Sequence, residues 1–118
     1  PFDDYDIPQH GKGVWAPSIR YHNDMFYVYF ATPDEGIFVS TTDDPYGKWN
    51  LKLCKKSCGW IDTCPFWDEE GQAYLIRGVA KSRIGYKSKL FLHKMSADGM
   101  ELLDDGVLVF DGRINHQP

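Results

Sequence analysis

Two stretches of this 118-residue chain repeat the same order of strand and turn signals, with Pro17 and Pro65 at equivalent positions 48 residues apart. Each stretch begins a strand near its proline, turns, and continues into a run of aromatic and aliphatic residues, 26–30 in the first and 74–76 in the second. Proline is tolerated at the first position of a strand because no ladder donor is needed there. Because helical periodicity is nearly absent, the repeat predicts two antiparallel β-meanders.

Each repeat contains four strand-like segments separated by turn residues such as Asn23-Asp24 and Asp98-Gly99. The eight predicted strands are 18–22, 25–31, 36–42, 49–53, 65–67, 73–78, 89–95 and 107–110. The second strand of each repeat is apolar on both faces, which is typical of a strand that is covered on both sides. A free-standing two-sheet sandwich would alternate more regularly, so we expect an all-β fold made of β-propeller blades.

Two four-stranded antiparallel blades do not close a ring, because a propeller typically needs at least four blades. We therefore interpret the chain as a central part of a larger propeller, in which residues 13–56 and 57–112 are the two blades. Residues 1–12 are then an inter-blade segment, and residues 113–118 begin the connection to the next blade. Such a piece exposes an apolar face on each flank, so we expect self-association unless the remaining blades are supplied.

Charge and composition exclude several classes of partner. Thirteen basic and seventeen acidic residues give a net charge of −4 without a basic stripe, which argues against nucleic acid. No apolar run approaches the roughly 18 residues that a membrane span needs. The chain begins at Pro1 without a leader pattern, so we expect a processed or cut segment, and the compartment stays open between bacterial cytoplasm and periplasm. The aromatic share of 15% suits either a β core or a sugar-binding surface.

Three cysteines lie close together, at Cys54, Cys58 and Cys64. An odd number excludes a fully paired set of intrachain disulfides. Their spacing differs from the Cys-x2-Cys pairs of structural zinc sites, and the four histidines show no metal-ligand spacing, so we predict no metal site from these residues. Semi-buried thiols in a reducing compartment fit best, and a Cys54–Cys58 or Cys58–Cys64 bridge is the alternative in an exported protein.

The first strand of every propeller blade lines the central axis, and its first residues face the mouth of the channel, where a small ligand is held. Here these positions are residues 14–17 and 61–65. Asp62 is the main candidate for chemistry, because its neighbours Trp60 and Ile61 predict a carboxylate in partly apolar surroundings. The alternative is that Asp62 caps a local backbone amide, which is a common use of aspartate.

Three further side chains are candidates for sugar binding. Trp15 is expected to stack on a sugar ring, whereas Trp60 either stacks on a sugar or packs between blades, and the pattern does not separate these two uses. Arg83, in the polar loop 81–88, is expected to reach a sugar hydroxyl or to orient a carboxylate, with a solvated basic loop as the alternative.

Several motifs, in the right order, resemble glycoside hydrolase family 43, and together they cover nearly the whole chain. Residues 13–22 with 26–29 are similar to the second-blade signature of that family, and residues 44–49 resemble the "DP-G-W" turn that follows it. Residues 59–75 resemble the third-blade motif "ID-x-x-x-F-x-D-x-D-G-x-x-Y-L", and residues 82–88 resemble the "SR-x-G-x-KS" loop of some subfamilies.

The resemblance implies part of a five-bladed propeller that hydrolyses xylosides, arabinofuranosides and related links of plant cell-wall polysaccharides with inversion. Family members use an aspartate base, an aspartate that adjusts the pKa of the acid, and a glutamate acid. Only the second of these corresponds to a residue here, Asp62. The resemblance also implies substrate-binding roles for Trp15, Ala16, Ile61 and Arg83. The base is expected before Pro1 and the acid shortly after Pro118.

This chain alone is therefore expected to be inactive, because inversion needs both an acid and a base. No cofactor is required, and a structural calcium ion in the channel of the intact propeller is compatible with the resemblance. The expected partners are an oligosaccharide or polysaccharide substrate and the remaining blades. One alternative is a non-catalytic carbohydrate-binding propeller module. The other, ranked last because kelch and tryptophan–aspartate repeat signatures are absent, is a propeller that binds protein partners.

Overall fold

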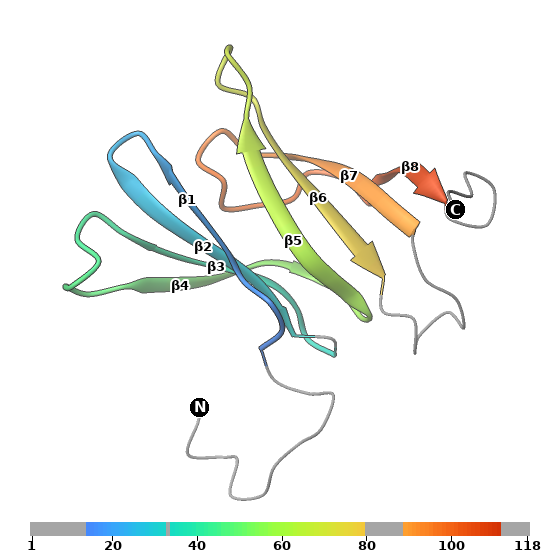
Figure 1. Cartoon of the computed structure of the whole chain (residues 1–118), viewed down its shortest axis with the longest axis horizontal. Coiled ribbons are helices and arrows are strands. Elements are labelled where there is room, and N and C mark those ends of the chain that lie inside the picture. Colours follow the sequence, from blue (N-terminus) through green and yellow to red (C-terminus); the bar gives the residue numbers. More distant parts are fainter. Residues whose placement is uncertain (1–13, 33, 80–88, 112–118) are drawn as a thin grey trace, which may run out of the picture.

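The computed structural model describes residues 14–32, 34–79 and 89–111, which form two antiparallel β-sheets (Figure 1). The strands are β1 (Ser18–His22), β2 (Met25–Thr32), β3 (Gly36–Thr42), β4 (Asn50–Lys56), β5 (Trp60–Trp67), β6 (Ala73–Val79), β7 (Lys89–Met95) and β8 (Val107–Asp111). The first sheet has the order β1-β2-β3-β4 and the second has the order β5-β6-β7-β8. Each strand therefore pairs with its neighbour in sequence, as expected for a meander.

The hairpin between β1 and β2 turns through Asn23 and Asp24, whose φ angles are 48° and 63°. Two consecutive positive φ angles between the paired residues His22 and Met25 correspond to a type I′ turn. Asparagine and aspartate adopt this left-handed conformation more readily than other residues with a side chain. The turn predicted at these two residues is confirmed, and its tightness follows from their chemistry.

All eight strands predicted from the sequence are present, and two of them differ clearly in their bounds. β4 covers Asn50–Lys56 rather than 49–53, because its last residues pair with the start of β3 across a bulge. β5 begins at Trp60, five residues before the predicted start at Pro65. These additional residues contain a second register shift, which interrupts the alternation that marks a strand in the sequence.

The hydrophobic core lies between the two sheets. Tyr29 and Val39 from the first sheet and Leu75 and Met95 from the second are fully buried. The other buried members of this cluster are Tyr27, Ala31, Ile37, Cys54, Ala73 and Leu102. The Tyr29 hydroxyl donates a 2.7 Å hydrogen bond to the main-chain carbonyl of Gly99, so the core also contains a polar link between the sheets.

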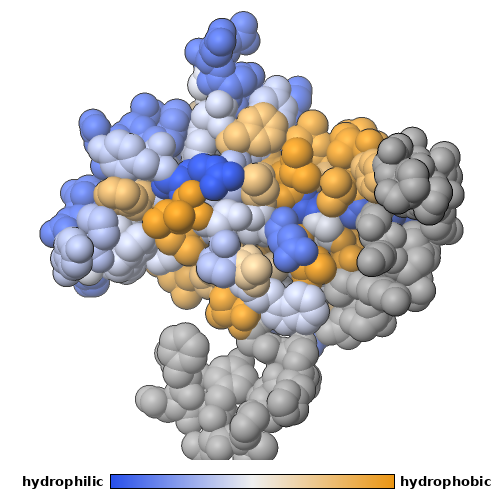
Figure 2. Space-filling view, viewed as in Figure 1, coloured by the Kyte–Doolittle hydropathy of each residue, from blue (hydrophilic) through white to orange (hydrophobic). Residues whose placement is uncertain are grey.

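The outward faces of the two sheets carry exposed apolar side chains. On the first sheet, Ile19 and Leu51 lie on the face opposite the buried tyrosines, because neighbouring residues of a strand point to opposite faces. On the second sheet, Phe66, Leu90 and Val107 lie on the face opposite Leu75. Figure 2 shows apolar surface over the part of the molecule that β6, β7 and β8 occupy. The predicted apolar flanks are thus confirmed for the described residues.

Candidate functional site

Asp62 lies in a bulge near the start of β5. Ile61 pairs with Gly78 and Cys64 pairs with Ile76, so Asp62 and Thr63 together face one residue of β6. The φ angle of Asp62 is 55°, a left-handed value that is uncommon for residues other than glycine. Bulges of this kind redirect a side chain relative to its strand and are frequent next to active sites. The local backbone therefore presents the Asp62 carboxylate differently from a regular strand residue.

The Asp62 side chain is exposed, and its carboxylate accepts no hydrogen bond from the described residues. The partly apolar surroundings that Trp60 and Ile61 predicted are therefore not found among the described residues. The alternative of a capping aspartate is not seen among the described residues either. Asp62 is a solvent-accessible anion on the first strand of the second sheet, which is a geometry that allows it to act on a neighbouring group.

The other side of the bulge is attached to the first sheet. The Ser18 hydroxyl, at the start of β1, donates a short hydrogen bond to the main-chain carbonyl of Thr63. Farther along the same strand, the Arg20 guanidinium lies 3.1 Å from the Cys64 sulfur. Thr63 itself is buried, with its hydroxyl unpaired among the described residues. The starts of β1 and β5 are therefore side by side, as the propeller interpretation requires.

Three of the predicted substrate-binding residues lie within the described ranges. Trp15 is half-buried, and its main-chain N–H donates a 3.0 Å hydrogen bond to the carbonyl of Ala31, which holds the segment before β1 against β2. Ala16 is exposed, and Ile61 is half-buried in the residue before Asp62. Trp15 and Ala16 lie just before β1, and Ile61 lies on β5. The hydrogen bond between Ser18 and Thr63 holds these two strands together. Arg83 lies outside the described residues.

Trp60 packs within the protein. The guanidinium carbon of Arg77 lies 3.6 Å from the centre of its ring, and the His93 ring is tilted against it at a centroid distance of 4.9 Å. These contacts lie within the second sheet, so Trp60 packs inside its own blade rather than between blades. The face of the indole that Arg77 covers is not available to a sugar.

Arg77 is a buried cation from β6 that sequence reasoning did not single out. Its guanidinium is placed between the rings of Trp60 and Phe91, with 4.2 Å to the second ring centre. Burial lowers the Arg77 pKa to about 10, so the side chain still carries its charge at neutral pH. Stacking on two aromatic faces compensates part of the lost hydration of that charge.

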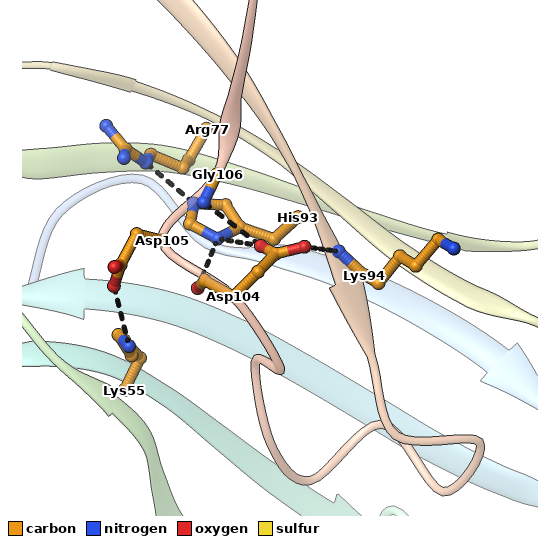
Figure 3. Close-up of polar contacts among 7 residues, drawn as sticks. All are labelled: Lys55, Arg77, His93, Lys94, Asp104, Asp105 and Gly106. Atoms are coloured by element: carbon orange, nitrogen blue, oxygen red, sulfur yellow. Dashed lines mark hydrogen bonds and ion pairs between the residues drawn. The ribbon is translucent and has the colours of Figure 1, made fainter.

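Arg77 contacts the buried His93, which in turn contacts the partly exposed Asp104 (Figure 3). The Nε of Arg77 donates a 3.0 Å hydrogen bond to Nε2 of His93, so the imidazole proton is on Nδ1. That N–H points to the Asp104 carboxylate at 3.1 Å and to its main-chain carbonyl at 3.2 Å. Asp104 also accepts from the main-chain N–H groups of Lys94 and Gly106. Burial is the main cause that lowers the His93 pKa, and the Arg77 charge adds to it.

Arg77 and His93 could have been found in the sequence as polar interruptions of the apolar runs 73–79 and 89–95. A charged or titratable side chain at an inward position of a strand usually has a dedicated partner. Asp104 gave no such signal, because aspartates are ordinary in turns. Its partnership with His93 depends on the pairing of β7 and β8.

The described ranges contain neither a metal-binding group of side chains nor a disulfide. There, no group of three or more His, Cys, Asp or Glu side chains could hold a metal ion. The calcium ion expected from the resemblance concerns the channel of a complete propeller and stays a prediction. Cys54, Cys58 and Cys64 are all free, which agrees with thiols rather than with either alternative bridge. No helix among residues 14–32, 34–79 and 89–111 is long and apolar enough to cross a membrane.

Residues 3–117 match the family described as glycosyl hydrolases family 43, which is nearly the whole chain. The chain belongs to this family. Over 103 residues it is 52% identical to a protein named putative beta-xylosidase from Xylanibacter ruminicola, a match that covers 86% of this chain and 19% of that protein. Over 108 residues it is 32% identical to a beta-xylosidase from Formosa agariphila, covering 85% of this chain and 18% of that protein.

The family 43 fold is also seen in the structural comparison. The crystal structure of a xylan beta-1,4-xylosidase from Bacillus halodurans superposes with a TM-score of 0.70 at 20% identity, covering 86% of this chain and 21% of that one. This likeness confirms the predicted fold class, in which the two four-stranded sheets correspond to propeller blades. The chain spans about a fifth of the length of these family 43 relatives.

Proposed function

We propose that this chain is a segment of an inverting glycoside hydrolase that acts on xylosides or arabinofuranosides of plant cell-wall polysaccharides. Within it, Asp62 adjusts the pKa of the catalytic acid. The observation that carries the proposal is the exposed Asp62 carboxylate on a left-handed bulge of β5, beside the start of β1. The name beta-xylosidase, which the two relatives reported above share, supports the xyloside part of this substrate class.

The proposed role of Asp62 follows from the requirements of inversion. One carboxylic acid protonates the leaving oxygen, while a carboxylate on the opposite face of the sugar activates water. A third carboxylate near the acid raises the pKa of that acid by like-charge repulsion, which keeps it protonated near neutral pH. Asp62 is suited to this third role because it is accessible and its charge is not shared with a nearby cation among the described residues.

Substrate contacts and the missing carboxylates complete the proposal. Trp15, Ala16, Ile61 and Arg83 are proposed to line the sugar site. The base and the acid are proposed to come from parts of the protein outside residues 1–118, which makes this chain inactive by itself. The mechanism needs no cofactor, because proton transfer between carboxyl groups and water is sufficient.

A chimera tests the proposal. In it, this chain replaces the matching segment of the Xylanibacter ruminicola protein. The remaining parts of that protein are proposed to supply the base and the acid. We expect the chimera to release p-nitrophenol from an aryl xyloside or an aryl arabinofuranoside, and residues 1–118 alone to release none. Asp62→Asn in the chimera is expected to lower kcat by at least about tenfold.

Asp43→Asn is the matched control, since Asp43 is another exposed aspartate whose side chain has no partner among the described residues, and it lies in the turn after β3. Its activity should equal that of the unchanged chimera. An unchanged kcat in Asp62→Asn, or hydrolysis by residues 1–118 alone, contradicts the proposal. A chimera that binds xylo-oligosaccharides without hydrolysing either substrate supports the carbohydrate-binding alternative instead.

A further inference from the structure

Arg77 is the one residue of β6 that faces the two-residue bulge of Asp62 and Thr63. Its neighbours Ile76 and Gly78 pair with Cys64 and Ile61 on either side of that bulge. We infer that Arg77 is a positioning residue, which fixes the bulge and thereby the direction of the Asp62 carboxylate. This inference rests on the function proposed above, because it concerns how Asp62 is held for its role.

The contacts of Arg77 join the bulge to the strand on the other side of β6. Its guanidinium lies over Trp60 on β5, two residues before Asp62, at 3.6 Å from the ring centre. The opposite partner is Phe91 on β7, at 4.2 Å. A planar guanidinium between two rings has few alternative orientations. Arg77 therefore ties the backbone that leads into the bulge to the middle of the second sheet.

His93 and Asp104 hold the guanidinium from its edge. His93 accepts from Arg77 at 3.0 Å, and its other nitrogen donates to Asp104 in the connection that precedes β8 (Figure 3). The imidazole is fully buried and Gly106 lies against it, where an added Cβ would come within 2.8 Å of the ring. Each member of this chain of three side chains is thus fixed by the next.

The contacts of Arg77, His93 and Asp104 help to maintain the backbone conformation of Asp62. Aspartate adopts a left-handed backbone more readily than most residues with a side chain, but inside a strand this conformation persists only when the surrounding structure determines it. On one side of the bulge, Ser18 holds the Thr63 carbonyl. On the other side, Arg77 packs beneath Trp60. Removing the Arg77 contacts should therefore let the bulge relax and change where the Asp62 charge lies.

Arg77→Leu in the chimera is the central test, because leucine keeps an apolar body but loses the stacking and the hydrogen bond. We expect kcat to fall by about tenfold to a hundredfold, as for other small misplacements of catalytic groups. KM should stay within about twofold, because Arg77 touches no substrate in this proposal. The alkaline limb of the pH–rate profile should move down by about half a pH unit, since a displaced Asp62 raises the pKa of the acid less.

Two further variants separate positioning from a general loss of packing. His93→Gln keeps one donor and one acceptor and should resemble the unchanged chimera, whereas His93→Leu should behave as Arg77→Leu does. Tyr29→Phe is the matched control, because it removes another buried hydrogen bond between the sheets, to Gly99. It is expected to lower the melting temperature without shifting the pH–rate profile.

The double variant Asp62→Asn with Arg77→Leu should be no slower than Asp62→Asn alone, because Arg77 acts through Asp62. The inference is overturned if Arg77→Leu changes only the melting temperature, as Tyr29→Phe does, or if its effect on kcat adds fully to that of Asp62→Asn. If Arg77→Leu is insoluble, two other variants can be used to measure kcat, the pH–rate profile and the melting temperature. Arg77→Lys removes the planar guanidinium that stacks on Trp60 and Phe91, and His93→Leu removes the acceptor of the Arg77 hydrogen bond.

A readout without activity separates this inference from the proposed function. If Asp62→Asn leaves kcat and the pH profile of the chimera unchanged, the proposed function fails, but the positioning of Asp62 is still measurable. The 13C carboxyl resonance of Asp62, assigned by its loss in Asp62→Asn, should shift in Arg77→Leu and stay in place in Tyr29→Phe. An unchanged resonance in Arg77→Leu overturns the inference.

Discussion

The Ser18 hydroxyl on β1 donates a hydrogen bond to the main-chain carbonyl of Thr63 on β5, across 45 positions of sequence. This bond joins the first strand of one blade to the first strand of the next. It also holds the residue that follows Asp62, so the link between the blades and the support of the candidate site are the same contact.

Ser18→Ala should lower the free energy of unfolding of the chimera by about 1 kcal/mol, because the buried Thr63 carbonyl loses its donor. Urea unfolding followed by tryptophan fluorescence measures this loss. Ser57→Ala is the matched control, since the Ser57 hydroxyl is buried without a partner among the described residues. Its removal should change stability by no more than about 0.5 kcal/mol. Equal effects of the two substitutions would contradict the role given to Ser18.

Gly99→Ala should destabilise the chimera more than Gly71→Ala. Both glycines have a positive φ angle, 73° and 84°, so both substitutions incur the left-handed penalty of about 1–2 kcal/mol. Only at Gly99 would the new Cβ collide with the Tyr29 hydroxyl and lie 3.0 Å from the Trp67 ring, which adds about 1–3 kcal/mol. Gly71 has open space there. Combining Gly99→Ala with Tyr29→Phe should recover part of the loss, and no recovery would argue against this steric explanation.

The free energy of unfolding of the chimera should fall as the pH decreases from about 7 to 5. Burial lowers the pKa of His93, so below its ordinary value of about 6.5 the unfolded chain binds a proton that the folded chain still lacks. Each proton bound only by the unfolded chain favours unfolding. The pKa of Asp98 is also lowered, by hydrogen bonds from Ser96 and Met100, but its effect lies below about pH 4.

Melting temperatures measured at intervals between pH 7 and 5 test this dependence. His93→Gln should show a smaller decrease over the same interval, because glutamine does not titrate there. An equal decrease in both proteins would show that His93 is not the group responsible.

The three thiols should react with Ellman's reagent at different rates. Cys58 is exposed and should react first, whereas Cys54 is buried and its pKa is raised to about 12, which leaves almost no reactive thiolate. Cys54 should therefore react only when the protein unfolds in urea. Cys58→Ser should remove the fastest phase and leave the slow phase unchanged. A fast phase that persists in Cys58→Ser would contradict the exposure of this site.

The strands and hairpins were predictable because they depend on local chemistry. Asn23 and Asp24 form their turn from their own backbone preferences, and the apolar run of β2 marks a strand that is buried on one face and half-buried along most of the other. The motif order was also sufficient to predict the family. These features need no knowledge of which strands face each other.

The bulge at Asp62 and the group around Arg77 were not predictable in the same way. A bulge is defined by two strands together, and the sequence of β5 does not state which residue of β6 will face Asp62. The chain from Arg77 to Asp104 joins β6, β7 and the connection before β8. Trp60 illustrates the same limit, because only the position of Arg77 distinguishes packing from sugar stacking.

Residues 1–118 alone should self-associate through their outward faces. Leu51 on the first sheet is 62% exposed and Phe66 on the second is 39% exposed, each among further apolar side chains of its face. Contiguous apolar surface of this kind is uncommon on monomeric proteins and favours association. Size-exclusion chromatography with light scattering should give a mass that increases with protein concentration.

Lysine substitutions locate the surfaces responsible for this association. Leu51→Lys and Phe66→Lys should each lower the apparent mass, because a charge in an associating apolar face must lose its hydration. Tyr46→Lys is the control: Tyr46 is fully exposed but lies in the turn before β4, outside both faces. It should leave the mass unchanged. If the unchanged chain elutes as a monomer at every concentration, its apolar flanks do not drive association. That result would contradict the expectation that these faces must be covered by neighbouring blades.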